Sequence, residues 1–342
     1  MNVHVVVPGL FPDPARADAM LAPTRVDALE LLAARGRRRS AGAAGLEAWF
    51  LEAFGVARQT DWPAAPYSLL GDDGEPDGAC WLRADPVALQ AVHDTVLVAD
   101  ASLLDIGREE AAALAASLNE HFAGQGIVFH PVRPGRWYAR VGENPEMTAA
   151  PLADVPGAAL MDHLPQGPRG RHWRAIFTEI QMRLHDHPVN RGREARGALP
   201  LNGVWLWGAG RAAERVRARY RRVTADDPVA RGLARAAGTR SDPLPATAGD
   251  WLGQSDRAGV EAIVLDALRA PAARGDSATW QSVLQRLEQD WFAPLLAALR
   301  AGRIGMITLV APGPLQTQEF ETTRQDLRFF WRRRRRLAEY AA

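Results

Sequence analysis

The sequence predicts an α/β protein in which an α+β lobe interrupts a larger core. Val3 to Val7 is a β-branched run that closes at Pro8-Gly9, as a buried strand ending in a turn would. Two similar apolar runs follow near the other end of the chain, at Val260 to Leu265 and Ile304 to Val310. Between residues 79 and 141, strand patterns surround one helical pattern, which favours a compact α+β unit.

The remaining patterns of the core predict helices and loops. Arg25 to Arg35 has Val26, Leu29 and Leu32 at helical spacing and predicts a helix. We also expect a buried helix at Leu46 to Phe54, a long helix at Trp280 to Arg300 and a terminal helix at Gln316 to Tyr340. Thr24 is a residue type that caps helix N-termini, so we expect it to cap the first of these helices. Two charged stretches that contain glycine predict loop or surface structure, at residues 35–45 and 211–247.

The inserted lobe has strand and helix patterns of its own. Its strand candidates are Ala79 to Arg83, Val96 to Val98, Gly126 to His130 and Trp137 to Val141. Arg108 to Phe122 and Trp173 to His185 are amphipathic and predict helices. Pro, Gly and Asp cluster between Asp61 and Gly78, which indicates a domain junction. We therefore expect a core of residues 1–72 and 204–342 and a lobe of residues 79–200.

Composition narrows the class of protein. The chain has 342 residues, 47% of them hydrophobic, which is enough to bury a sizeable core. Its 41 basic and 40 acidic side chains give a net charge of +1, so no overall field drives it onto nucleic acid. Cys80 is the single cysteine and favours a reducing compartment. No stretch approaches about 18 apolar residues and no basic leader begins the chain, so we expect a cytoplasmic protein without a membrane span.

A polar loop, an apolar strand and a glycine turn follow one another between His187 and Gly210. Pro188 prevents the preceding helix from continuing and biases His187 toward extended backbone. Val204 to Trp207 predicts a short buried strand, and the glycines after it would let backbone approach a ligand closely. Such a succession is how α/β proteins build sites at the carboxyl ends of strands. The alternative is a plain loop between two core elements.

This stretch also resembles a known family. His187-Pro-Val-Asn190, Arg193, Gly197, Pro200-Leu-Asn202 and Trp205-Leu-Trp-Gly-Ala-Gly210 look like the signature of the archaeal-type, cofactor-independent phosphoglycerate mutases. Those are metal-dependent members of the alkaline-phosphatase superfamily. Ala79 to Asp85 resembles the family's strand that carries an Arg and a polar residue two positions later, and Arg136-Trp-Tyr138 resembles a second Arg-bearing strand. The resemblance covers roughly residues 79–210 and implies an alkaline-phosphatase-like core sheet flanked by helices.

The same resemblance implies a centre of two metal ions, for which this sequence lacks the expected residues. The family's Asp-Gly after the first strand corresponds to Pro8-Gly9, and its Ser nucleophile corresponds to Gly45-Leu46-Glu47. The Asp and His expected after the strand at 260–265 meet Ala267 to Arg274, and those expected after the last strand meet Ala311-Pro-Gly313. A two-metal site needs carboxylate and imidazole ligands. We interpret the metal centre as absent, with Asp13, Ser40 or Asp276 as the available substitutes.

The polar residues of the lobe persist by contrast. By resemblance, six of them fall where the family's substrate lobe faces the active cleft: Arg83, Arg136, His187, Asn190, Arg193 and Asn202. Three arginine forks that converge on a cleft suit a ligand carrying a phosphate and a carboxylate. In the alternative interpretation these residues are structural, so that Arg83 and Arg136 are ion-paired strand residues and Asn202 caps a turn.

Two other motifs carry weaker signals. His185-Asp-His187 offers two imidazoles for a metal, but side chains two positions apart at a helix end diverge, so a favourable interaction of a histidine with the helix dipole is the simpler interpretation. Arg332 to Arg336 are five consecutive arginines that could contact phosphate or anionic lipid. Mixed charges around them favour a solvated or partner-facing helix.

Three functional hypotheses follow. The first is a phosphoglycerate-mutase-like pseudoenzyme without cofactor, which binds a small anionic metabolite in a sensing or regulatory role. Similar proteobacterial proteins are sometimes labelled phosphoglycerate mutase or regulatory protein. The second is an active mutase or phosphatase with relocated ligands for Mn, Zn or Mg. The third is an interaction protein that uses the Arg-rich C-terminal helix to bind a partner, with nucleic acid the less expected one.

Overall fold

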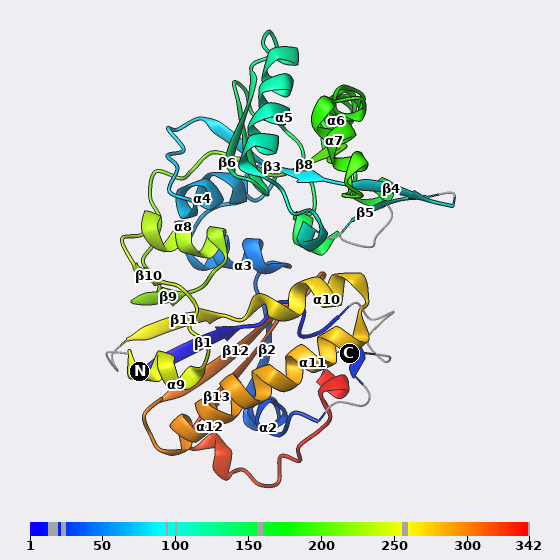
Figure 1. Cartoon of the computed structure of the whole chain (residues 1–342). Coiled ribbons are helices and arrows are strands. Elements are labelled where there is room, and N and C mark those ends of the chain that lie inside the picture. Colours follow the sequence, from blue (N-terminus) through cyan, green and yellow to red (C-terminus); the bar gives the residue numbers. More distant parts are fainter. Residues whose placement is uncertain are drawn as a thin grey trace. The chain divides into compact units, whose positions relative to one another are not determined.

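The computed structural model describes residues 1–12, 20–21, 25–93, 95–99, 101–155, 160–254 and 259–340 (Figure 1). Asp13 and Thr24, for which we expected a metal-ligand and a capping role, lie outside these residues. The chain forms two compact units, one of residues 1–55 and 216–342 and one of residues 56–215. No helix in the described ranges is long and apolar enough to cross a membrane.

The first unit contains a seven-stranded mixed sheet in the order β10-β9-β11-β1-β12-β13-β2. The strands are β1 (Asn2–Val6), β2 (Arg37–Ala41), β9 (Arg222–Thr224), β10 (Arg240–Asp242), β11 (Val260–Val264), β12 (Met306–Pro312) and β13 (Thr317–Thr323). β1 pairs in parallel with β11 on one side and β12 on the other, so that His4 is opposite both Ala262 and Thr308. The carboxyl ends of these three strands therefore lie at one edge of the sheet. β13 and β2 are antiparallel additions at the far side.

Helices flank this sheet and bury its apolar residues. They are α2 (Asp27–Arg35), α3 (Leu46–Ala53), α8 (Pro228–Ala236), α9 (Ala248–Gly253), α10 (Arg269–Arg274), α11 (Ser277–Leu287) and α12 (Ala293–Arg300), with a π-helical turn over Glu288–Phe292 between the last two. Val3 and Val5 alternate into one apolar core with helix residues such as Trp280 and Leu295. Short 3-10 turns follow β11 at Asp266–Leu268 and close the chain at Asp326–Arg328 and Leu337–Tyr340.

Two predictions for the first unit are wrong. Residues 316–340 do not form a helix, because Thr317 to Thr323 is a strand with alternating burial and Arg332 to Arg336 are exposed irregular backbone. The β-branched threonines in that stretch favour extended backbone over helix. The expected basic loop at 35–45 contains edge strand β2, whose arginine side chains are all exposed. Neither strand has the apolar run by which the buried strands were predicted.

The second unit contains a separate antiparallel sheet in the order β6-β7-β3-β8. Its strands are β3 (Cys80–Val87), β6 (Ile127–Arg133), β7 (Arg136–Val141) and β8 (Gly203–Gly210), and a hairpin of β4 (Leu89–Val92) and β5 (Thr95–Val98) stands apart from them. The helices are α4 (Ala64–Gly71), α5 (Arg108–His121), α6 (Gly170–His185) and α7 (Pro188–Ala195), and 3-10 turns lie at Ala101–Leu103, Leu152–Asp154 and Leu160–His163. The predicted α/β class with a second α+β unit is confirmed.

Several boundaries differ from those expected. The units divide after residues 55 and 215, and strand β8 pairs with β3 instead of joining the larger sheet. Residues 61–78, expected as a junction, contain helix α4. The polar loop expected after His187 begins with helix α7, because Pro188 occupies the first helical turn, where a missing N–H costs nothing. His187 has extended backbone as predicted, and its imidazole Nδ1 accepts the Val189 N–H.

Asn190 ties α6, α7 and β8 together inside the second unit. Its side chain is fully buried, and its amide donates to the carbonyl oxygens of Leu184 at 2.7 Å and Leu201 at 3.1 Å. Its Oδ1 accepts the Leu201 N–H at 2.8 Å. Asn202 makes a similar link outward, since it donates to the Leu89 carbonyl and accepts the Leu89 N–H. Both asparagines replace backbone pairing that the chain cannot make at these turns.

We predict that Asn190→Ala destabilises the second unit by about 2–3 kcal/mol, because it leaves buried backbone groups without partners. The Leu201 amide should lose its protection in native-state hydrogen exchange, and the unfolding midpoint in urea should fall. Asn144→Ala, an exposed asparagine that accepts only the Glu146 N–H, is the matched control and should change stability little. An unchanged exchange rate of the Leu201 amide in Asn190→Ala would show that the Asn190 side chain does not hold this amide.

Candidate functional site

Four loops meet at the carboxyl edge of the larger sheet, where the resemblance places a metal centre. The turn after β1 lies against the start of α10, since a Cβ on Gly9 would be 2.7 Å from the Leu268 carbonyl oxygen. Gly9 also has a φ of +76°, so both the backbone conformation and the lack of space for a side chain require glycine there. Gly45, which precedes α3, donates its N–H to the Gly313 carbonyl after β12 at 3.0 Å. The segments following β1, β11 and β12 and the start of α3 are therefore neighbours.

A buried ion pair occupies this edge. Arg269 donates from Nη1 to Glu47 Oε1 at 2.7 Å and from Nη2 to Glu47 Oε2 at 2.9 Å, and both side chains are almost fully buried. Bidentate pairing of this kind is among the strongest polar contacts in proteins. Glu47 stands where a hydroxyl nucleophile was expected, and Arg269 stands where metal ligands were expected. The charge that a bound cation would supply to Glu47 is supplied by a guanidinium.

Asp266 is a carboxylate at this edge that the sequence analysis overlooked. It follows β11 directly, in the 3-10 turn, and burial raises the pKa of its carboxyl although Arg269 opposes that shift. Among the described residues, no group of three or more His, Cys, Asp or Glu side chains is placed to hold a metal ion. The donors present do not fit a two-metal centre.

The two described residues named as substitute ligands have structural positions. Ser40 lies in the exposed edge strand β2, opposite Gln318. Asp276 caps α11, where its carboxylate accepts the Thr279 N–H at 3.1 Å. In the described part of the chain, neither Ser40 nor Asp276 forms a hydrogen bond or ion pair with Glu47 or Asp266.

Two of the six predicted site residues, Arg83 and Arg136, belong to one polar network in the second unit. Arg83 is buried and binds Asp85 Oδ1 at 2.6 Å and Ser68 Oγ at 2.7 Å. Ser68 contacts the Tyr138 hydroxyl at 2.9 Å, which in turn donates to Asp72 at 2.8 Å. Arg136 completes the chain with two bonds to the Asp72 carboxylate, at 2.8 and 2.6 Å.

Electrostatics fix the charge states in this network. Burial disfavours the ionised form of Asp72, but hydrogen bonds from Arg136 and Tyr138 outweigh burial and hold its pKa below the ordinary value. Burial also raises the pKa of the Tyr138 hydroxyl, which therefore stays protonated and donates. The Arg83 guanidinium is also sandwiched near the rings of Tyr138 and Trp207, at 5.4 and 5.1 Å from their centroids. The Arg83 side chain is therefore occupied by contacts with Asp85, Ser68 and two aromatic rings.

The other four predicted residues lie elsewhere in the second unit. Arg193 on α7 is 1% exposed and bonds to Glu110 at 2.7 Å and to the carbonyl oxygens of Leu199, Asp105 and Leu104. His187 and Asn190 hold the ends of α7, and Asn202 holds the β4 hairpin, as described above. Among the described residues, no hydrogen bond or ion pair joins this group to Arg83 or Arg136. The three arginine forks do not present their donors together.

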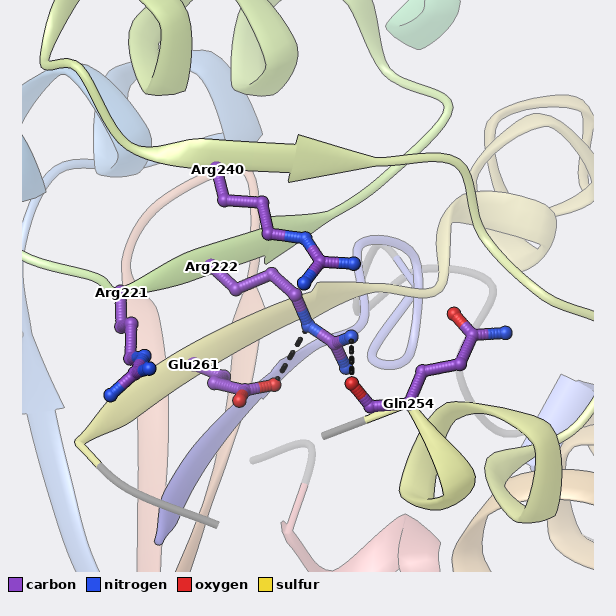
Figure 2. Close-up of a pocket in the computed structure, with 5 residues that line it drawn as sticks. All are labelled: Arg221, Arg222, Arg240, Gln254 and Glu261. Carbon is purple, nitrogen blue, oxygen red and sulfur yellow. Dashed lines mark hydrogen bonds and ion pairs between the residues drawn. The ribbon is translucent and has the colours of Figure 1, made fainter. Parts of the chain in front are cut away.

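An arginine-lined cavity, here called the arginine pocket, lies at the amino ends of β9, β10 and β11 (Figure 2). It has a volume of about 240 Å³ and is lined by Arg221, Arg222, Arg240, Gln254 and Glu261. Arg222 is buried and donates to Glu261 Oε2 at 3.0 Å and to the Gln254 carbonyl at 3.2 Å. Arg240 is about half exposed and pairs through Nε with Asp242 at 2.8 Å, while its two terminal amino groups make no hydrogen bond to another described residue.

One residue in the sequence, Glu261, could have indicated this pocket. Glu261 interrupts an otherwise apolar strand, and a carboxylate that is 2% exposed requires a cationic partner. Arg222 supplies that partner from the neighbouring strand, in register with Glu261. The short strands that carry Arg222 and Arg240 lie in a stretch expected to be surface helix and loop, so their pairing could not be anticipated.

Comparison with known proteins supports the resemblance and limits what it shows. A 2,3-bisphosphoglycerate-independent phosphoglycerate mutase from Methanosarcina mazei is 29% identical over 205 residues, which cover 56% of this chain and 50% of that protein. One from Methanothrix thermoacetophila is 34% identical over 116 residues, which cover 33% of this chain and 28% of that protein. This chain thus spans half or less of the length of these curated relatives. No protein-family model matches it.

Among solved structures, the PH0037 protein from Pyrococcus horikoshii has the same fold, with a TM-score of 0.57 over 94% of this chain and 87% of that one at 12% identity. The two sequence matches and this shared fold agree with the motif between His187 and Gly210. The chain is a distant homologue of the archaeal-type 2,3-bisphosphoglycerate-independent phosphoglycerate mutases.

Proposed function

We propose that this protein is a non-catalytic relative of the metal-dependent phosphoglycerate mutases that binds a small anionic metabolite in a sensing or regulatory role. The observation that carries the proposal is the bidentate Arg269–Glu47 pair at the carboxyl edge of the sheet. A guanidinium cannot accept an electron pair from a substrate oxygen or activate a bound water as a metal ion does. Repulsion by Arg269 would also weaken cation binding nearby.

The arginine pocket is the proposed place for the anionic ligand. Arginine forks match the geometry of phosphate and carboxylate oxygens, and Arg240 has terminal donors directed at the cavity side of β10 (Figure 2). Arg222 is held rigid by Glu261 and by the ring of Trp251, 5.5 Å from its guanidinium carbon. Of the six residues first predicted, Arg83 and Arg136 with the Asp72 network remain a second proposed place, in which the Arg136 side chain is 38% exposed.

We predict that the purified chain holds far less than one equivalent of Mn, Zn or Mg and does not interconvert 3- and 2-phosphoglycerate when these metals are added. The reason is that the described carboxylates near the sheet edge, among them the paired Glu47 and the half-buried Asp266, belong to no group of three metal ligands. Elemental analysis and a coupled mutase assay measure the two outcomes, with a metal-loaded archaeal mutase as positive control. About two ions per chain, the stoichiometry of a two-metal site, would support the active-enzyme hypothesis instead.

A paired substitution separates a structural ion pair from a residual metal ligand. Arg269→Ala removes both guanidinium hydrogen bonds from the buried Glu47 carboxylate and should destabilise the first unit by about 3–5 kcal/mol, whereas Glu47→Leu combined with Arg269→Met should be nearly neutral. Thermal unfolding of both variants with and without Mn²⁺ measures this. If Mn²⁺ at modest concentration stabilised Arg269→Ala but not the double variant, Glu47 would be a latent metal ligand.

The ligand site is tested with inorganic phosphate and 3-phosphoglycerate as probes. Both should raise the melting temperature of the wild type, and Arg240→Ala should weaken binding about tenfold or more by removing a charge-assisted contact worth roughly 1.5–3 kcal/mol. Arg171→Ala, an exposed arginine of the second unit, is the charge-matched control. Loss of binding in Arg136→Ala but not in Arg240→Ala would move the site to the Asp72 network.

A further inference from the structure

Two arginine-rich segments that are far apart in the sequence form one surface of the first unit. We call it the basic edge, and it consists of Arg35, Arg38 and Arg332 to Arg336. β2 is the outermost strand of the sheet, and its arginines are exposed. From the sequence, the first segment was expected to be a loop and the second a helix. Their proximity became evident only from the structure.

Backbone contacts fasten the two segments to each other. The Arg35 guanidinium donates to the carbonyl oxygens of Phe329 and Arg332, and Arg332 returns a bond to the Arg35 carbonyl at 2.7 Å. Arg38 donates to the Tyr340 carbonyl at 3.2 Å. Leu337 and Tyr340 are buried in the apolar core, so the segment is anchored on its C-terminal side. The basic edge is therefore a built surface of the folded unit.

The basic edge carries an excess of positive charge. Among the described residues, the carboxylates that ion-pair with its seven arginines are Asp27 and Glu30, both of which contact Arg334. The whole chain has a net charge of only +1, so this charge is concentrated locally. Such an excess attracts an anionic surface within the screening length of the solution.

Two large aromatic side chains project beside these arginines. Phe330 is 78% exposed and Trp331 is 63% exposed, and every residue from 330 to 336 is exposed. Their rings contact each other edge to face, with centroids 5.3 Å apart and an interplanar angle of 79°. An exposed Phe–Trp pair next to cationic side chains has the composition of segments that enter the interface of a bilayer.

We propose that the basic edge binds the surface of an anionic lipid bilayer, with Phe330 and Trp331 inserted at headgroup level and the arginines on lipid phosphates. A bilayer is favoured over nucleic acid by the aromatic geometry. Stacked bases need open, successive ring faces. Here Phe330 and Trp331 meet edge to face, and Arg332 covers the Phe329 ring at 4.9 Å. The rings form an apolar knob, which suits insertion between lipids.

The test is sedimentation of the full chain with vesicles of phosphatidylcholine, with and without phosphatidylglycerol. We expect binding to the anionic vesicles only, weakening as salt is raised. Arg333→Gln, Arg335→Gln and Arg336→Gln combined should reduce partitioning about a hundredfold, because each arginine near an anionic bilayer contributes about fivefold. This variant leaves the Arg334 ion pairs intact. Phe330→Ser with Trp331→Ser should reduce binding about tenfold or more at constant charge.

The matched control combines Arg58→Gln, Arg108→Gln and Arg171→Gln, which removes the same charge from exposed positions of the second unit and should leave vesicle binding unchanged. Equal losses in the control and the basic-edge variant would mean that net charge alone drives binding and would overturn the proposal. So would no vesicle binding by the wild type, or tight binding of a single-stranded oligonucleotide in its place. If the aromatic variant bound vesicles with wild-type affinity, the proposed insertion of Phe330 and Trp331 would be wrong.

Discussion

The pairing of a buried arginine with a carboxylate determines how this molecule uses its polar residues. Arg269 with Glu47, Arg222 with Glu261, Arg83 with Asp85 and Arg193 with Glu110 all follow this pattern. A guanidinium stays ionised inside a protein, so every buried one must be surrounded by acceptors. Once those acceptors are in place, few donors remain for a ligand. This constraint explains why arginines that resemble a substrate site in sequence hold elements together in the structure.

The family resemblance is therefore a stronger guide to fold than to chemistry. Asn190 and Arg193 match the motif, and both bind backbone carbonyls that position α7 and β8. A residue used in this way is required whatever reaction the protein performs. The edge that would hold metal ions is built from residues outside the motif, and there the carboxylate donors give way to an ion pair. Distant homology is compatible with the absence of a metal centre that we propose, because the motif and this edge are formed by different parts of the chain.

Sequence patterns predicted the elements whose burial repeats regularly. β1, β11 and β12 are apolar runs, α3 is buried over most of its length, and α5 and α6 have one apolar face, so each was found within a few residues of its ends. Strands at the sheet margin were missed because an exposed edge needs no apolar side chains. β2 is made of arginines and a serine before Ala41, and its structure follows from pairing with β13. Pairing partners 270 or more residues away leave no mark in a local window.

Candidate sites were harder to predict for a related reason. The four loops that meet at the sheet edge could be named from the sequence, because three of them follow predicted apolar strands and the family resemblance indicates the fourth. The arginine pocket and the basic edge were missed, since each combines residues that only lateral strand pairing brings together. A charged residue within a strand carries information that periodicity alone ignores: Glu261 implies an unseen cation, and the arginines of β2 imply an edge kept free of further strands. When a charged residue interrupts a strand pattern, the sequence therefore predicts either an oppositely charged partner or an exposed sheet edge.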